Sequence, residues 1–99
     1  MENYTIIQTC TSFPTKSRAF EIAKLFVAER SVACAQISDN TMSIYHWNGV
    51  FNQDKEVLLT LKTPRSMYKE VESRIMEHHP YVNPEIIGIP VIMGSEKYT

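Results

Sequence analysis

The sequence predicts an α+β fold with the element order β-α-β-β-α-β, and three kinds of pattern support this prediction. Two stretches place apolar residues at the spacing of three and four that is typical of a helix with one buried face. Runs rich in β-branched and aromatic residues flank these stretches, as expected of strands. Asn48-Gly49 separates two of the runs and is the strongest hairpin signal in the chain. The length of 99 residues suits one domain, which we expect to span residues 1–99.

A strand and then a helix are expected at the start of the chain. Residues 4–11 (YTIIQTCT) are mostly β-branched or aromatic, and Pro14 follows closely enough to break the strand. Thr15 belongs to the residue types that cap helices, and the helix after it is expected to run to about Arg30. The apolar stripe of this helix consists of Ala19, Ile22, Ala23 and Phe26.

A long hairpin is expected in the middle of the chain. Residues 32–37 (VACAQI) predict a short strand that is covered on at least one face, with Cys34 in the core. Residues 42–47 predict the outgoing strand of the hairpin and residues 50–63 its return strand, on either side of the Asn48-Gly49 turn. Such a hairpin is longer than the core of a small domain needs. Its outer part should therefore project from the protomer unless another subunit covers it.

A second helix and a last strand complete the predicted fold. Thr63 is expected to cap the helix and Pro64 to lie in its first turn. Pro80 disfavours helical backbone at the preceding residue, so the helix should end there. The core face of the helix is marked by Tyr68, Val71 and Ile75. Residues 86–93 (IIGIPVIM) predict the final strand, and helices on one face of an antiparallel sheet in this order make a ferredoxin-like fold.

Charge and composition argue against several classes of function. The net charge is −1 and no run of Lys or Arg occurs, which argues against nucleic-acid binding. No apolar run approaches the roughly 20 residues of a membrane helix, so no membrane contact is expected. Neither a Ser-His-Asp pattern nor a phosphate-binding glycine loop nor a dinucleotide fingerprint is present, so we do not expect an enzyme. Two cysteines in strand-like segments are most simply explained as reduced thiols of a cytoplasmic protein.

Two adjacent histidines, His78 and His79, lie where the second helix must end. Imidazole is the commonest protein ligand for a transition metal, and its charge changes near neutral pH. A helix end holds such groups in a fixed place, so the pair is a candidate metal site. The alternative reading is structural, with one ring packed against the fold and the other in solvent.

The chain resembles the CutA family of divalent-cation tolerance proteins over essentially its whole length. The residues that carry the resemblance are Cys10, Ala33-Cys34, residues 43–49 (SIYHWNG), Glu56, residues 61–63 (LKT), residues 78–81 (HHPY) and residues 84–86 (PEI). The hairpin block and the His-Pro-Tyr block, in this order and spacing, make the match specific. The resemblance implies a ferredoxin-like protomer, related in architecture to PII signalling proteins, that assembles as a homotrimer in the cytoplasm.

The resemblance also implies binding of copper or another divalent metal ion, without an established catalytic activity. Carried over by position, the metal ligands are Cys10, His78 and His79. Thiolate and imidazole suit copper or zinc far better than magnesium or calcium. A strand cysteine and a helix-end histidine become neighbours only if the tertiary fold brings them together. The alternative is a buried cysteine that acts as a small apolar residue.

A cleft between subunits is a second candidate site implied by the resemblance. The residues that can border it in a trimer are Tyr45, Trp47, Glu56, Lys62, His79 and Glu85. Strand alternation places the two hairpin aromatics on one face, although such side chains are also common packing and interface residues. Polar groups around an aromatic-lined cleft are typical of a small-molecule pocket. The rival function is therefore a PII-like sensor of a small anion or metabolite, or a trimeric scaffold for a protein partner.

Overall fold

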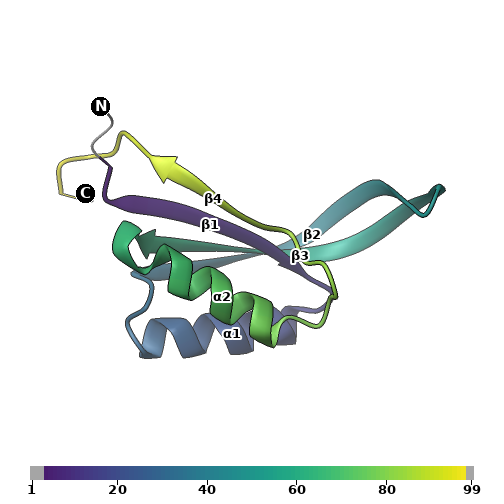
Figure 1. The fold of residues 1–99 in the computed structure, drawn as a ribbon, viewed down its shortest axis with the longest axis horizontal. Coiled ribbons are helices and arrows are strands. Elements are labelled where there is room, and N and C mark those ends of the chain that lie inside the picture. Colours follow the sequence, from purple (N-terminus) through teal and green to yellow (C-terminus); the bar gives the residue numbers. More distant parts are fainter. Residues whose placement is uncertain (1–3, 98–99) are drawn as a thin grey trace.

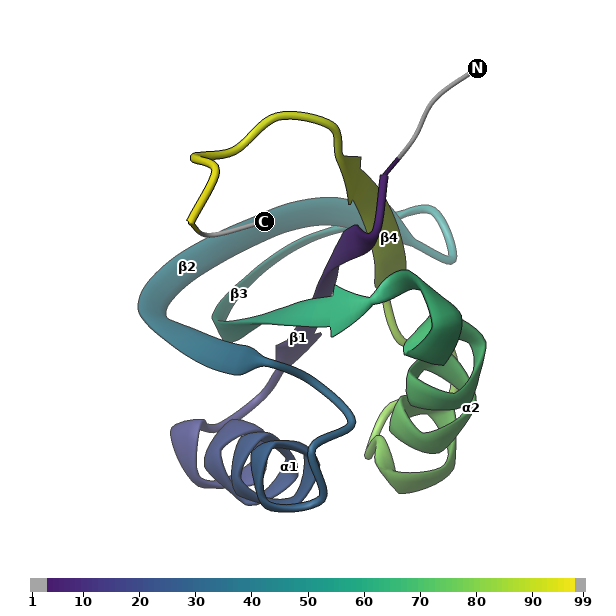
Figure 2. The same cartoon turned by 90° about the vertical axis from the view of Figure 1, so that its left-hand side faces the viewer.

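The computed structural model describes residues 4–97, which form an antiparallel sheet with two α-helices on one face (Figures 1 and 2). The elements are β1 (Ile6–Phe13), α1 (Lys16–Ala28), β2 (Cys34–Trp47), β3 (Val50–Pro64), the 3-10 helix η1 (Arg65–Met67), α2 (Tyr68–His78) and β4 (Ile86–Val91). The four strands lie in the order β2-β3-β1-β4, so the two strands of the hairpin are neighbours, with β2 at one edge of the sheet. This architecture confirms the predicted α+β fold and its element order.

The hydrophobic core lies between the sheet and the two helices, where the predicted helical stripes meet the strands. The buried positions of α1 are Ala19, Ile22, Ala23 and Phe26, and those of α2 are Val71 and Ile75. They pack against one face of the two central strands, which includes Phe13, Leu59 and Leu61 at 0% exposure. Side chains alternate between the faces of a strand, so this core uses every second residue of β1 and β3.

The other side of the sheet has no helix over it among residues 4–97, and we call it the open face (Figure 2). The strand register places on it Ile6, Gln8, Cys10, Cys34, Gln36, Leu58, Thr60, Lys62, Ile87, Ile89 and Val91. Ile87 and Ile89 on β4 are 46% and 48% exposed, whereas the large apolar residues of the core are almost fully covered. Cys34 lies half-buried on this face, so its predicted place in the core is wrong.

The predicted hairpin projects beyond the rest of the protomer as a two-stranded arm (Figure 1). Asn48 and Gly49 form its turn with φ values of 53° and 78°, as the sequence predicts. The two strand-like runs before the turn are one continuous strand, β2, with a register shift between Ser38 and Thr41. Asn40 has a φ of 62° within this irregularity. The exposed large apolar residues of the arm are Met42, Ile44, Tyr45, Trp47, Val50 and Phe51.

Thr15 caps α1 as predicted, but Thr63 does not cap α2. The backbone N–H of Arg18 donates to Thr15 Oγ1 at 3.3 Å. Thr63 instead lies buried in β3, where its hydroxyl shares a 2.8 Å hydrogen bond with Thr9. Pairing between β1 and β3 continues to Pro64, so the chain remains extended past the predicted helix start and α2 begins only at Tyr68. None of the helices within residues 4–97 is both long and apolar enough to cross a bilayer.

Candidate functional site

His79 ties the end of α2 to the end of β1. The helix stops at His78, and His79 is extended because Pro80 follows it. The His79 ring stacks on Phe13 with centroids 4.3 Å apart, and Nε2 lies 2.7 Å from the carbonyl oxygen of Ser12. The backbone N–H of Tyr81 donates to Nδ1 at 3.1 Å. Since Nδ1 accepts a hydrogen bond, Nε2 carries the proton and donates to Ser12.

These contacts favour a neutral His79. Partial burial lowers the pKa of the imidazole below its usual 6.5, although the hydrogen bond to Ser12 opposes this effect in part. The positive charge of Arg18 lowers the pKa further, and Glu56 raises it. Both ring nitrogens are already used by backbone groups. A metal ion could therefore bind His79 only by displacing one of them.

The three metal ligands expected from the resemblance do not converge within one protomer. Cys10 is on the open face, where it lies opposite Thr60 and Ile87 in the register. His79 stacks on Phe13, whose ring belongs to the core on the helix side. His78 is exposed at the end of α2. Among residues 4–97 no group of three His, Cys, Asp or Glu side chains is placed to hold a metal ion, so this set does not fit a metal site in one chain.

A groove of about 760 Å³ lies between the arm and the loop that joins α2 to β4. Its lining residues are Ser12, Ser43, Ile44, Tyr45, Trp47, Asp54, Glu56, Pro80, Tyr81, Val82, Asn83 and Glu85. Four residues of the predicted cleft, Tyr45, Trp47, Glu56 and Glu85, come together here within a single chain. Lys62 does not line the groove, and its ammonium group donates to Gln36 Oε1 at 3.3 Å on the open face.

Two tyrosine–carboxylate pairs shape the groove. Tyr81 donates its hydroxyl to Glu56 Oε2 at 2.8 Å, and Tyr45 donates to Asp54 across the arm. Burial and the bond to Glu56 raise the pKa of Tyr81 above its ordinary value. The bond to Asp54 is the main cause that raises the pKa of Tyr45. Both phenols therefore remain protonated, and they hold the carboxylates that give the groove its negative charge.

Tyr81 and Asp54 are groove residues that the sequence analysis did not single out. Tyr81 lies within the HHPY block, in which candidate metal ligands were predicted at the histidines and a helix end at Pro80. Asp54 lies opposite Ser43 in the register and hence diagonally across from Tyr45. Hairpin pairing from the Asn48-Gly49 turn would have located this neighbour.

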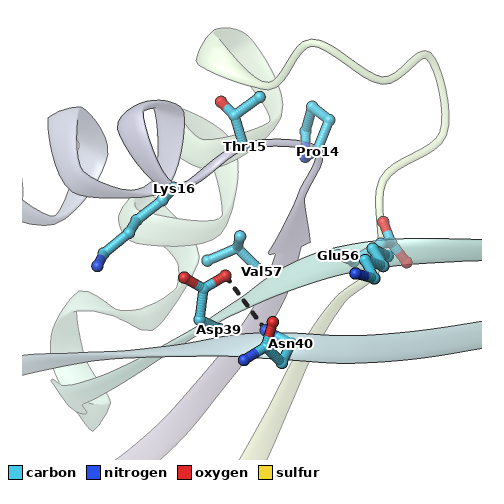
Figure 3. Close-up of a pocket in the computed structure, with 8 residues that line it drawn as sticks. Pro14, Thr15, Lys16, Asp39, Asn40, Glu56 and Val57 are labelled. Carbon is cyan, nitrogen blue, oxygen red and sulfur yellow. Dashed lines mark hydrogen bonds between the residues drawn. The ribbon is translucent and has the colours of Figure 1, made fainter.

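A smaller hollow of about 150 Å³ lies where α1 begins, beside the irregular part of β2 (Figure 3). Thr15 and Lys16 border it from the helix, and Asp39 and Asn40 from the strand (Figure 3). The N–H of Asn40 donates to Asp39 Oδ1 at 3.2 Å. Lysine and carboxylate side chains are mixed in this hollow, so it selects neither an anion nor a cation. The larger groove is the better candidate for a ligand.

Comparison with known proteins agrees with the fold and with the resemblance seen in the sequence. The family model described as CutA1 divalent ion tolerance protein matches residues 7–99. Divalent-cation tolerance protein CutA of Thermus thermophilus is 38% identical over 85 residues, which cover 86% of this chain and 82% of that protein. The Escherichia coli O139:H28 protein of the same name is 33% identical over 94 residues, covering 95% of this chain and 83% of that protein. The crystal structure of CutA1 from the psychrotrophic bacterium Shewanella sp. SIB1 superposes with a TM-score of 0.92 at 31% identity, covering 97% of this chain and 90% of that chain. The chain belongs to the CutA1 divalent ion tolerance protein family.

Proposed function

We propose that this protein acts in divalent-cation tolerance as a cytoplasmic homotrimer that binds copper or another soft metal ion through Cys10. The observation that carries the proposal is the apolar open face with a half-buried thiol near its centre. Cys10 lies on an inner strand of the sheet, between β3 and β4. The proposed role is binding rather than catalysis, in keeping with the names of its relatives.

The exposed apolar surface supports assembly of several copies. The open face carries Ile87 and Ile89, and the arm carries Trp47 and Phe51 at 59% and 58% exposure. Apolar surface of this extent is characteristic of an interaction site in a soluble protein. Packing copies together would cover it, together with the exposed sheet edges formed by β2 and β4. Three copies is the number implied by the family resemblance.

The chemistry of Cys10 favours a soft ion. A thiolate binds copper(I) or zinc more strongly than it binds magnesium or calcium. His79 of the same chain packs on the helix side of the sheet, so it is a poor partner for Cys10. A thiol on a face that another copy covers can find further ligands on that copy. We therefore expect metal binding to require the assembled protein.

A comparison of the two cysteines tests this proposal. Cys10 and Cys34 are both half-buried on the open face, so Cys34→Ser is a matched control for Cys10→Ser. Copper(I) held by a chromophoric chelator is titrated with each protein under anaerobic conditions. Cys10→Ser should weaken copper(I) binding by about tenfold or more, because Cys10 supplies the only thiolate among the expected ligands Cys10, His78 and His79. Equal affinity of the wild type and Cys10→Ser would refute the metal role.

Assembly is tested separately by light scattering at micromolar protein concentration. A mass of about three times the 11.4 kDa protomer is expected. Lys substitutions at Ile87 and Ile89 place charge on the open face along the edge strand β4 without touching the core, and should reduce the mass to that of one protomer. A monomeric wild-type protein would refute the trimer.

A further inference from the structure

The arm joins the rest of the protomer at an irregular place in β2. Asp39 and Asn40 together lie opposite the single residue Val57 of β3, which is the arrangement of a β-bulge, and we call these two residues the bulge. Val57 also pairs with Phe13, the last residue of β1. From Val57 toward the turn, β3 pairs only with β2 within residues 4–97. The bulge therefore lies at the base of the arm, where the sheet narrows to two strands (Figure 1).

The bulge allows one strand to keep two different registers. Pairing counted from the Asn48-Gly49 turn places Tyr45 and Trp47 on the same side of the sheet as the open face. If this pairing continued unchanged into the body of the protomer, Ala35 and Ile37 would also lie on the open face, because a shift of one residue moves every side chain to the other face. Ala35 and Ile37 are instead half-buried against the core. The extra residue thus serves both the core and the arm.

Local contacts give the bulge one defined shape. Asn40 has a φ of 62°, in the left-handed region that asparagine adopts more readily than most residues. Its backbone N–H donates to Asp39 Oδ1 at 3.2 Å. Both residues border the hollow at the start of α1, together with Thr15 and Lys16 (Figure 3). The bulge therefore lies beside the helix layer, on the covered side of the protomer.

A bulge at this place sets the direction in which the arm leaves the body. Bulges bend their strand and increase its local right-handed twist. The arm that continues from the bend carries exposed apolar residues on both faces, with Trp47 at 59% exposure on one face and Phe51 at 58% on the other. An isolated two-stranded hairpin is at best marginally stable in water. The direction of the arm therefore matters for what covers it.

We propose that the bulge aims the arm at a second copy of this chain, and that Asn40 is a residue that determines the geometry of this contact. The inference rests on the assembly proposed above and adds the element that directs it. A second copy fits the arm because Tyr45 and Trp47 continue the apolar open face, so one surface of the chain can meet the same kind of surface on another copy. The helices already cover the other side of the body.

Deletion of Asn40 tests the role of the bulge in assembly. The deletion leaves Asp39 alone opposite Val57, so the pairing becomes regular and no side chain changes face. Asn40→Gly is the matched control, because glycine adopts a positive φ without steric cost and keeps the bulge. Light scattering over a dilution series gives the midpoint of dissociation. The deletion should raise this midpoint at least about tenfold, and Asn40→Gly should match the wild type.

The direction of the arm is measured separately, by energy transfer from Trp47, the single tryptophan of the chain. The acceptor is a dansyl group on Ser17→Cys, at an exposed position of α1, in chains that also carry Cys10→Ser and Cys34→Ser. Labelled chains are mixed with an excess of unlabelled chains of the same variant, so that transfer within one chain dominates. Deletion of Asn40 should change the transfer efficiency, whereas Asn40→Gly should not.

Two results would overturn the proposal while the wild type still assembles. Unchanged energy transfer in the deletion variant would show that the bulge does not direct the arm. Changed transfer with a wild-type dissociation midpoint would show that the direction of the arm does not decide the contact. A wild type that is monomeric throughout the dilution series refutes the assembly itself, and this proposal with it.

A second substitution keeps the test decisive if circular dichroism shows that the deletion variant does not fold. Asn40→Val retains the length of the chain, but a β-branched residue is strongly disfavoured at a φ of 62°. Its dissociation midpoint should rise above that of Asn40→Gly. Equal midpoints of these two variants would contradict the proposed role of Asn40.

Discussion

Replacement of His79 by alanine distinguishes a structural histidine from a metal ligand. The change removes the stacked contact with Phe13, the hydrogen bond to the Ser12 carbonyl and the acceptor of the Tyr81 N–H. An aromatic pair contributes about 0.5–1.5 kcal/mol and each hydrogen bond about as much. The sum of the three contributions is about 1.5–4.5 kcal/mol, and because the half-buried site lets water replace part of the lost bonding we expect a loss of about 1.5–3 kcal/mol.

The assay is urea unfolding of the metal-free protein, followed by circular dichroism at one fixed protein concentration. The concentration is fixed because the proposed assembly would contribute to the apparent free energy of unfolding. His78→Ala is the matched control: this neighbouring side chain is exposed, so its loss should change the free energy of unfolding by less than about 0.5 kcal/mol. His79→Phe keeps a ring on Phe13 and loses both hydrogen bonds, so it should fall between the two.

Equal stability of His79→Ala and His78→Ala in metal-free protein would refute this reasoning. A residue kept only as a metal ligand would give that result, because its loss matters only when metal is bound. The expected order of stability is wild type and His78→Ala first, then His79→Phe, then His79→Ala.

Three more predictions concern pH, metal binding and packing. Because the folded state lowers the pKa of His79 below 6.5, the unfolded state takes up more protons, so wild-type stability should fall as pH drops from about 6.5 toward the lowered pKa. The urea midpoint of His79→Phe should lack this part of the pH dependence. Identical pH profiles of the wild type and His79→Phe would contradict the prediction. Copper affinity should fall steeply between about pH 7 and 5, because protons compete for thiol and imidazole; a flat affinity would exclude histidine from the ligand set. Gly88→Ala should cost about 1–3 kcal/mol of unfolding free energy, since its Cβ would lie 2.6 Å from Tyr68 Cε1 and 2.9 Å from Ile7 Cγ2. An unchanged urea midpoint would show that the Tyr68 ring moves aside freely.

The sequence predicted the elements well because their signals are local. The helical stripes, the Thr15 cap and the Asn48-Gly49 turn depend on residues that are close in the chain, and all three are found in the structure. The prediction that Thr63 caps α2 was wrong because the position of Thr63 depends on residues that are distant in the chain. Its position is decided by pairing with β1, which lies more than fifty residues away, and this pairing keeps the chain extended through Pro64.

The relative positions of the candidate site residues could not be predicted from the sequence. Glu56 and Lys62 lie six residues apart on β3 and share a face of it, because side chains alternate along a strand. Six residues of strand nevertheless span about 20 Å, so a common face is not a common site. Sequence spacing also could not predict whether Cys10 and His79 lie close together. It depends on which face of β1 the helices cover, and this places the two side chains on different sides of the sheet.

The surface proposed for metal binding and assembly is the open face, which the core of the protomer does not use. The helix face is closed by residues such as Phe13 and Leu59 at 0% exposure, so the protomer gains no core from the apolar residues of the open face. Tyr45, Trp47 and Glu56 continue the open face along the arm, because the register pairs the first two with even-numbered residues of β3. The thiol of Cys10 and the wall of the groove therefore face the same way. In the proposed homotrimer, a contact that covers one of them would lie next to the other, so metal binding and subunit assembly are best measured on the same preparation and at the same protein concentration.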